Sequence, residues 1–229
     1  MSIIIEIRAA EGGSDAKLLV QEQFVIYVKF ATRRGLDLAV LEDRPGFLTA
    51  EMSGKESILK RFAANEVGGM RWQRVPPTEK RGRRQTSTVT VAVLAVPKES
   101  ECHLSEQEVD FKFTRGSGAG GQHRNTTDSA VVATHRTTGI SVRVESERSQ
   151  HQNKRQAMDF LRARLAEAQA EKQRGATNTR RKSQVGSGMR GDKVRTASTF
   201  RDEVVDHRTG KRVKYQKDYS RGNIEALWA

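Results

Sequence analysis

The sequence predicts an α+β chain with two domains. The side chains of Thr86–Val96 alternate in the manner of a strand, whereas apolar residues recur at helical spacing after Ser149. A polar stretch that begins at Pro97 interrupts the chain between these two patterns. With 229 residues, of which 35% are hydrophobic, the chain is long enough to bury two cores. We expect a mixed sheet-and-helix domain over 1–103, completed by 190–229, and a β-hairpin/helix domain over 104–189.

The first part of the chain reads as strands and helices in turn. A β-rich run at Ile3–Arg8 precedes a helix that Ser14 or Asp15 can cap, and Gly35 is placed to end this helix. Further strands are expected at Leu36–Leu41 and Phe47–Met52 around the turn Arg44-Pro45-Gly46, and a second helix at Ser57–Asn65.

The second part begins with another alternating run at Val109–Phe113. A hairpin is expected where Ser129–Thr134 and Ile140–Val144 flank a Thr-Thr-Gly turn. Ser149 and Gln152 have the spacing of a capping box, which predicts the start of a helix. Residues 174–200 show no periodicity and predict a basic loop or linker, followed by short β elements near Val204 and Val213–Tyr215.

Charge indicates a polyanionic partner. The net charge is +13, and residues 148–221 contain 20 of the 41 lysines and arginines but only 8 of the 28 acidic residues. A second basic cluster lies at 71–84. A positive field of this kind attracts phosphate groups. Because the two basic clusters lie on either side of a glycine-rich segment, a nucleic-acid partner is favoured over the alternative that the charges only face solvent. The sequence has no long apolar stretch, so we do not expect a membrane partner.

Cys102 is the only cysteine. It cannot form a disulfide within the chain, and cysteine-based metal clusters are excluded. Cys102-His103 is a poor nucleophile–base pair because adjacent residues seldom face one another. We expect no metal and no cofactor. The first residues do not resemble a signal peptide, so we expect the cytoplasm as the compartment.

The most informative segment runs from Arg115 to Ala130, RGSGAGGQHRNTTDSA, with Glu147-Arg148-Ser149-Gln150-His151 downstream. Its glycines permit sharp bends and a close approach of the backbone to a partner. A Gly-Gly-Gln triplet alone is a weak signal, but the whole segment resembles the catalytic loop of bacterial class I peptide chain release factors. These factors hydrolyse peptidyl-tRNA on the ribosome. The resemblance extends from Glu6 to about Gly210.

The resemblance implies a catalytic role for Gly120, Gly121 and Gln122. In the family the glutamine backbone amide is thought to stabilise the transition state or the leaving group, and its side chain helps to exclude nucleophiles larger than water. His123 reads better as a loop or RNA contact than as a general base. Asp128 and Ser129 read as cap and turn residues.

A second resemblance concerns codon reading. The segment Gln73–Glu79 resembles the one that carries the Pro-x-Thr tripeptide of factors that read UAA and UAG. By analogy, the helix tip at Gly12 and Asp15 would meet the first base through backbone groups. Thr78 would bond the second base, and Gln73 with Thr86 the third. The residues that the resemblance assigns to codon reading are Gly12, Asp15, Gln73, Pro76, Thr78, Gln85 and Thr86.

The chain departs from the family pattern at Gln85, where the family commonly has a histidine that stacks on bases. The cluster Lys80, Arg83 and Arg84 makes this tip unusually basic, which favours contact with rRNA. The chain also begins where the second domain of the family begins, so we expect a short relative without the N-terminal helical domain.

We expect ribosome-dependent peptidyl-tRNA hydrolysis in termination at UAA and UAG. Codon-independent rescue of stalled or damaged ribosomes is one alternative, and a non-catalytic RNA-binding or ribosome-binding protein is another. The expected partners are rRNA, the mRNA stop codon, P-site peptidyl-tRNA and a glutamine methyltransferase acting on Gln122, and the chain is expected to be a monomer. The basic residues expected to contact RNA are Arg81, Arg83, Arg84, Arg115, Arg124, Arg148, Lys154, Arg155, Arg180, Arg181, Lys182 and Arg195.

Overall fold

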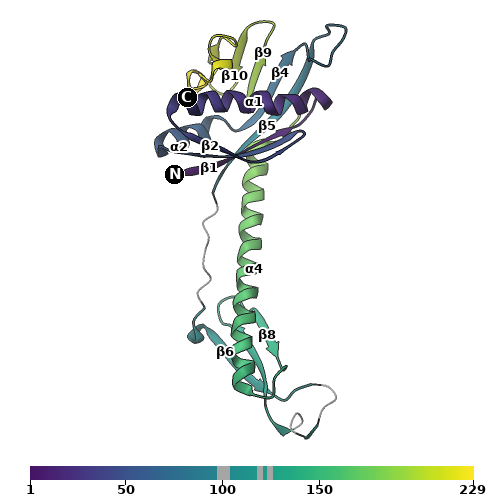
Figure 1. Cartoon of the computed structure of the whole chain (residues 1–229), viewed down its shortest axis with the longest axis vertical. Helices are drawn as coiled ribbons and strands as arrows, with labels where there is room; N and C mark the ends of the chain where they lie inside the picture. Colours follow the sequence, from purple (N-terminus) through teal and green to yellow (C-terminus); the bar gives the residue numbers. More distant parts are fainter. Residues whose placement is uncertain (97–103, 118–120, 123–125) are drawn as a thin grey trace. The chain divides into compact units, whose positions relative to one another are not determined.

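The computed structural model describes residues 1–96, 104–117, 121–122 and 126–229 (Figure 1). The chain divides into two compact units. Unit 1 comprises Met1–Pro97 and Thr177–Ala229, and unit 2 comprises Lys98–Ala176. The interruption predicted at Pro97–Glu101 and the lone Cys102 lie outside the described residues.

Among the described residues, unit 1 contains one eight-stranded sheet with the order β11-β10-β9-β4-β5-β1-β3-β2. Neighbouring strands are antiparallel except for β4 and β9, which are parallel. The C-terminal segment therefore supplies three strands beside β4. The strands are β1 (Ser2–Ala9), β2 (Asp37–Arg44), β3 (Phe47–Ser53), β4 (Gly68–Arg74), β5 (Gln85–Ala95), β9 (Arg195–Ser198), β10 (Glu203–Asp206) and β11 (Arg212–Val213).

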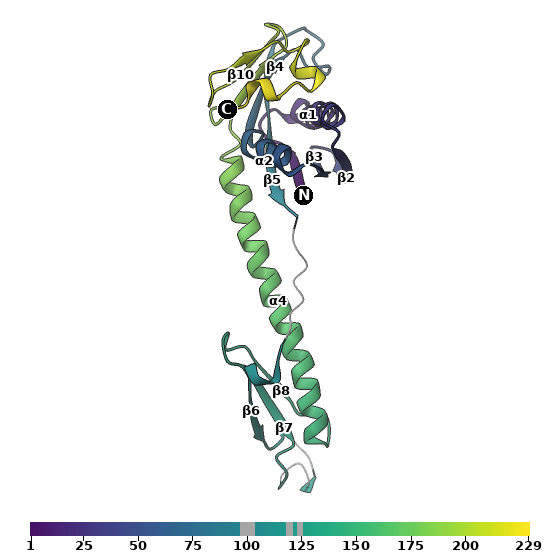
Figure 2. The ribbon, with the colours of Figure 1, turned by 90° about the vertical axis from the view of Figure 1, so that its left-hand side faces the viewer.

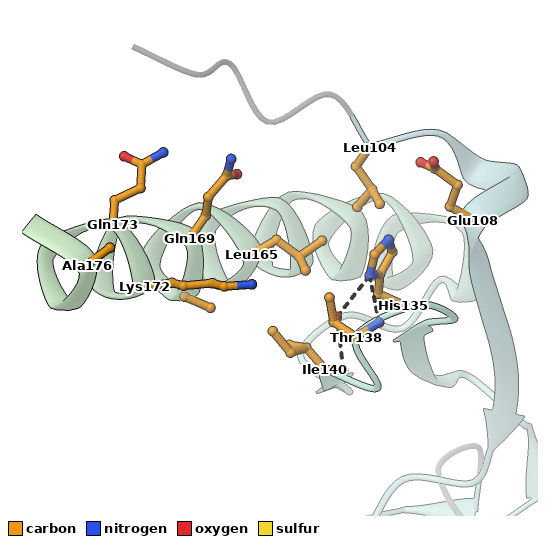
Figure 3. A pocket seen from close by; sticks show the side chains of 11 residues that line it. Leu104, Glu108, His135, Thr138, Ile140, Leu165, Gln169, Lys172, Gln173 and Ala176 are labelled. Atoms are coloured by element: carbon orange, nitrogen blue, oxygen red, sulfur yellow. Dashed lines mark hydrogen bonds between the residues drawn. The ribbon is translucent and has the colours of Figure 1, made fainter. Parts of the chain in front are cut away.

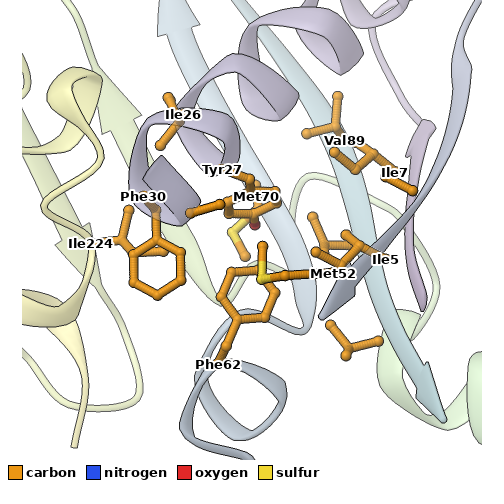
Figure 4. Close-up of a cluster of buried hydrophobic side chains, with 14 of the residues drawn as sticks. Ile5, Ile7, Ile26, Tyr27, Phe30, Met52, Phe62, Met70, Val89 and Ile224 are labelled. Carbon is orange, nitrogen blue, oxygen red and sulfur yellow. The ribbon is translucent and has the colours of Figure 1, made fainter. Parts of the chain in front are cut away.

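Helices α1 (Gly13–Arg34) and α2 (Glu56–Asn65) provide aromatic side chains to the core of unit 1 (Figure 4). Tyr27 meets Phe62 edge to face, with ring centroids 5.1 Å apart, and Phe30 stacks on Phe62 at 5.5 Å. Trp228, near the end of the chain, contacts Phe30 at 5.5 Å. The isoleucines of β1 at alternate positions 3, 5 and 7 are buried in the same core, as the period of a strand requires.

The ends of α1 show one correct and one wrong prediction. Gly35 ends the helix in the left-handed conformation at φ 61°, as its position predicted. Ser14 and Asp15 do not cap its start. Gly12 occupies the N-cap position, and no side chain there makes the capping hydrogen bond.

Unit 2 is a three-stranded antiparallel sheet covered by a helix (Figure 2). The strands are β6 (Val109–Thr114), β7 (Ala130–His135) and β8 (Ser141–Val144), and the helix is α4 (Gln150–Val185). Met158, Leu161 and Leu165 of α4 lie in one buried cluster with Val131 and Ala133 of β7. The predicted hairpin and the predicted packing of the helix on it are both confirmed.

The predicted linker at 174–200 is wrong. Helix α4 continues to Val185, and Arg195–Ser198 is strand β9. Residues 175–185 show no apolar stripe, and only five of the eleven are strong helix formers, namely Ala176, Arg180, Arg181, Lys182 and Gln184. They are helical because they extend α4, which begins at Gln150, and an extension needs no new nucleus. The amide of Gln184 at the helix end bonds both the backbone N–H and the carbonyl of Val93, at 2.9 Å each.

Candidate functional site

The glycine loop, residues 115–129, joins β6 to β7. Gly121 and Gln122 are exposed, and a Cβ placed on Gly121 would meet nothing within 4 Å. The hydroxyl of Thr126 donates to the carbonyl of Gln122 at 2.7 Å, which fixes the backbone just after the Gly-Gly pair. Gly120, His123 and Arg124 lie outside the described residues. The described part of the loop thus presents backbone that a large partner can approach.

Glu145, just after β8, anchors the first half of the glycine loop. Its carboxylate accepts the backbone N–H of Ser117 at 3.1 Å and the Ser117 hydroxyl at 3.0 Å. Arg143 donates both to Glu145 at 2.9 Å and to the carbonyl of Arg115 at 3.2 Å. The Ser117 amide, together with the Arg143 guanidinium, lowers the pKa of Glu145 to about 2. The carboxylate is therefore ionised at neutral pH and its hydrogen bonds are charge-assisted.

The first turn of α4 anchors the second half of the loop. Asn153 is fully buried, and its amide donates to the carbonyls of Ser129 at 2.8 Å and Glu147 at 2.9 Å. Its oxygen accepts the N–H of Glu147 at 3.0 Å. Gln150 donates to the carbonyl of Asp128 at 2.8 Å. Both ends of the glycine loop are thus fixed to the scaffold of unit 2.

Sequence reasoning missed Glu145 and Asn153 as supports of the loop. An asparagine in the first turns of a long helix is a weak signal, because asparagine is a poor residue for a helix interior unless its side chain has a specific partner. Glu145 had no comparable signal, because alternating charges surround it in the sequence.

The candidate codon-reading residues gather at one end of the sheet in unit 1. Gln73 of β4 and Thr86 of β5 are direct partners in the antiparallel register. Pro76 and Thr78 lie in the connection between these two strands, where Pro76 is buried and Thr78 is exposed. The structure therefore brings together the residues that the resemblance assigns to the second and third bases.

Glu79 organises this connection, which we call the reading loop, residues 75–84. Its carboxylate accepts the N–H of Arg81 at 2.8 Å, the Arg83 guanidinium at 3.2 Å and the amide of Gln85 at 2.8 Å. The Arg81 amide first, and then Arg83, lower the pKa of Glu79 below its ordinary value. The side chain of Gln85, the departure from the family pattern, is therefore tied to the reading loop itself.

Gly12 brings the tip of α1 against β5. Its φ of 138° belongs to the region that favours glycine, and an added Cβ would lie 2.5 Å from Ser87 Oγ. The side chain of Asp15 is buried and accepts two hydrogen bonds from Arg74, the closer at 2.6 Å. The Asp15 carboxylate thus positions β4 through Arg74, while the backbone of the helix tip at Gly12 lies against β5.

The basic residues expected to contact RNA differ in accessibility. Lys154 is half-buried and bonds Glu106 at 2.9 Å, and Arg181 is half-buried and bonds Glu6 at 2.6 Å. Those that are exposed are Arg81, Arg83, Arg84, Arg115, Arg148, Arg155, Arg180 and Lys182.

The expectation that Arg195 contacts RNA is wrong. Its side chain is 1% exposed and donates to Glu66 at 2.7 and 2.9 Å and to Asp206 at 3.1 Å. Trp228 and Tyr27 also donate to Glu66. The Arg195 guanidinium is thus part of a buried hydrogen-bond network that joins the C-terminal strands to the core, and it is not accessible to RNA.

A cavity of about 630 Å³ lies in unit 2 between the β7–β8 turn and α4 (Figure 3). Leu104, Ile140 and Leu165 give it an apolar wall, and Nδ1 of His135 lies 2.9 Å from the Thr138 hydroxyl. Its lining includes no described residue of the glycine loop, so it is separate from the candidate catalytic backbone. Among the described residues, no helix is long and apolar enough to span a membrane.

Two protein-family models match this chain, one over each part of the sequence. The PCRF domain model matches residues 1–91, and the RF-1 domain model matches residues 98–208. The chain is 40% identical to peptide chain release factor 1 of Borrelia garinii subsp. bavariensis, over 99% of this chain and 64% of that protein. It is 42% identical to peptide chain release factor 1 of Anaeromyxobacter dehalogenans, over 98% of this chain and 60% of that protein.

The solved structure of RF2 of Thermus thermophilus is similar, with a TM-score of 0.56 and 32% identity over 99% of this chain and 66% of that chain. A sheet-rich unit joined to a unit that bears a Gly-Gly-Gln loop is the architecture of a translational release factor. The chain belongs to the class I peptide chain release factors, of the release factor 1 type. It spans somewhat less than two thirds of the length of the curated relatives that it matches. The predicted family and the predicted α+β fold class are confirmed.

Proposed function

We propose that this chain hydrolyses peptidyl-tRNA on the ribosome in response to UAA and UAG. The observation that carries this proposal is the glycine loop, whose exposed Gly121-Gln122 backbone is held at both ends by buried or ionised side chains. A catalytic backbone amide needs such pre-organisation, because a donor that must reorganise during the reaction stabilises the transition state less.

The reaction is the hydrolysis of an ester. Water adds to the carbonyl carbon, the bond to the ribose oxygen breaks, and the peptide leaves with a carboxyl group while the tRNA regains its hydroxyl. The backbone N–H of Gln122 would donate to the oxygen on which negative charge develops, and its side chain would restrict the nucleophile to water. The proton transfers fall to the ribosome and the tRNA ribose.

Codon selection would take place at the other unit. The Thr78 hydroxyl can donate to or accept from the second base, and Gln73 and Thr86 lie side by side to meet the third. Unstacked bases expose the edges that such side chains read.

Peptide release from programmed ribosomes tests the proposal. The ribosomes hold peptidyl-tRNA in the P site and UAA, UAG, UGA, a sense codon or no mRNA in the A site. Gln122→Pro removes the backbone N–H, and Gln122→Ala removes the side chain but keeps the N–H. We expect release at UAA and UAG, a loss of about 10²–10³-fold in its rate for Gln122→Pro, and a much smaller loss for Gln122→Ala.

The outcomes separate the alternatives. Release without a stop codon would assign the chain to ribosome rescue, an alternative favoured by the binding of Gln85 to Glu79 and by the exposed arginines of the reading loop. Tight ribosome binding without release by the unmodified chain would indicate a non-catalytic RNA-binding protein. Equal rates for both Gln122 variants and the unmodified chain would refute the role of the backbone amide.

Three further expectations rest on the same proposal. The exposure of Gln122 makes its side-chain amide accessible to a glutamine methyltransferase, which mass spectrometry of the purified chain would detect. We propose the cytoplasm as the compartment, because the ribosome is the partner. We also propose a monomer, which sedimentation at several concentrations would test.

A further inference from the structure

An exposed aromatic side chain flanked by two arginines lies beside the candidate codon-reading residues. Phe200 is 41% exposed, the Arg84 guanidinium lies 4.4 Å from its ring centroid, and that of Arg201 lies 5.6 Å away. We call these three residues the Arg–Phe–Arg patch. Arg84 comes from the reading loop, and the other two come from the β9–β10 connection.

The backbone fixes this patch next to Gln73. The N–H of Thr199 donates to the carbonyl of Gln73 at 3.1 Å. Asp202 closes the β9–β10 connection with a φ of 48°, and its carboxylate accepts the N–H of Gln216 at 2.8 Å. Its carbonyl accepts the N–H of Tyr215 at 3.2 Å. Because a non-glycine residue seldom adopts this conformation, the surrounding bonds hold the connection in one shape.

A second arrangement in the same unit provides a comparison. Arg8 and Arg44 lie 4.4 and 5.0 Å from the ring centroid of Phe47. There each arginine has a carboxylate partner, because Arg8 bonds Glu6 at 3.1 Å and Arg44 bonds Glu42 at 2.7 Å.

Within the part of the chain that the structure describes, neither Arg84 nor Arg201 has a carboxylate within ion-pairing distance. Two exposed guanidiniums thus lie beside the Phe200 ring without a carboxylate partner. A guanidinium binds phosphate through paired N–H donors, and both guanidinium planes and aromatic rings stack on unpaired bases. The patch therefore combines the two properties that single-stranded RNA requires.

We propose that the Arg–Phe–Arg patch binds an unstacked RNA nucleotide next to the one read by Gln73 and Thr86, with a base on the stack and a phosphate on the guanidiniums. The location of this nucleotide next to a codon rests on the proposed function. Two sources share the chemistry, namely the mRNA nucleotide that follows the codon and an unpaired nucleotide of rRNA.

The test uses the full chain and ribosomes with tRNA in the P site and UAA in the A site. One mRNA ends at the third base of this codon, and the other continues beyond it. Phe200→Leu removes the ring and keeps an apolar side chain, and Arg84→Gln removes one charge. Phe47→Leu and Arg44→Gln are the matched controls at the arrangement in which each arginine has a carboxylate partner. Tryptophan fluorescence during denaturation verifies that each variant remains folded.

We expect Phe200→Leu to weaken binding at least about fivefold, the lower end of the range for one stacked base, and the controls to leave it unchanged. Arg84→Gln should weaken binding and reduce the slope of log K against log salt by about 0.7, the share of one phosphate contact in single-stranded RNA. A loss confined to the longer mRNA identifies the mRNA nucleotide, and an equal loss on both identifies rRNA.

The same four variants are titrated into a single-stranded oligoribonucleotide that contains 2-aminopurine, whose fluorescence falls on stacking. This measurement does not depend on termination, so a wild-type chain that releases no peptide would refute the proposed function and leave the patch open to this test. Binding by Phe200→Leu and Arg84→Gln that equals that of their controls in both assays would overturn the proposal.

Discussion

Exchange of Asn153 for aspartate is the sharpest test of the idea that α4 holds the glycine loop. In the native structure the Asn153 amide donates to the carbonyls of Ser129 and Glu147 at 2.8 and 2.9 Å. Asn153→Asp replaces this donor with a carboxylate oxygen of almost the same size. Two carbonyl oxygens then lose their donor and face a buried negative charge, whereas the packing volume hardly changes.

The magnitude follows from these bonds. Each carbonyl left without a donor costs about 1–3 kcal/mol, so the two lower the free energy of unfolding of unit 2 by about 2–6 kcal/mol before the buried charge is considered. This is a large part of the ~5–15 kcal/mol that stabilises a typical domain. Gln152→Glu, an exposed amide-to-acid exchange in the same helical turn, should cost less than about 0.5 kcal/mol and serves as the control.

The assay must report on unit 2 specifically. Both tryptophans and all three tyrosines belong to unit 1, so intrinsic fluorescence does not detect the change. Hydrogen exchange of the β7 amides detects it. The exchange rate should be higher in Asn153→Asp than in the unmodified chain, and that of Gln152→Glu should equal that of the unmodified chain. Peptide release should slow in parallel, because the second half of the loop loses its bond to Asn153 and keeps only the one to Gln150. Exchange and release rates equal to those of Gln152→Glu would refute the assigned role of Asn153.

Two further predictions concern charged groups. Arg195→Met leaves Glu66 buried without a cation and leaves Asp206 paired with Arg208 alone, and it should lower the free energy of unfolding of unit 1 by about 3–5 kcal/mol in denaturation followed by tryptophan fluorescence. A change no larger than that of Arg212→Met, which breaks an exposed pair worth about 0–1 kcal/mol, would contradict this. Glu145 has a folded-state pKa of about 2, below its ordinary 4.5, so its contribution is complete above pH 4.5 and is lost as the pH falls towards 2. The NMR chemical shift of the Ser117 amide proton, which is hydrogen-bonded to Glu145, should stay constant from neutral pH down to about pH 4 and change below it. A titration midpoint near pH 4.5 would show that Glu145 does not anchor the loop.

Local patterns predicted the elements that local physics determines. The alternation of Thr86–Val96 gave strand β5, and Gly35 gave the end of α1. Strand β4 was missed because its arginines and glutamine resemble a solvated basic run, although alternate residues such as Trp72 and Arg74 are buried. The end of α4 has no apolar stripe, so its sequence shows no helical period although the chain is helical to Val185.

The site shows the same division. The Gly-Gly-Gln and Pro-x-Thr segments are contiguous and therefore visible in the sequence. The role of Arg195 depends on Glu66, which lies 129 residues away in the chain, and no local pattern distinguishes it from the exposed arginines around it. Residues whose function is to hold another segment become recognisable only when both segments are placed.

The parallel pairing of β4 with β9 has a consequence for the order in which a nascent chain can acquire this structure. Arg71 and Thr196, which face each other in this pair, are 125 residues apart. At a synthesis rate of about 5–20 residues per second, β4 waits roughly 6–25 s for its neighbour. During that interval all of unit 2 can emerge and fold from contiguous sequence, while one edge of the unit 1 sheet stays open. The edge that carries the candidate codon-reading residues is thus among the last parts of the molecule to mature, and its non-local contacts give the sheet a high contact order and slow closure.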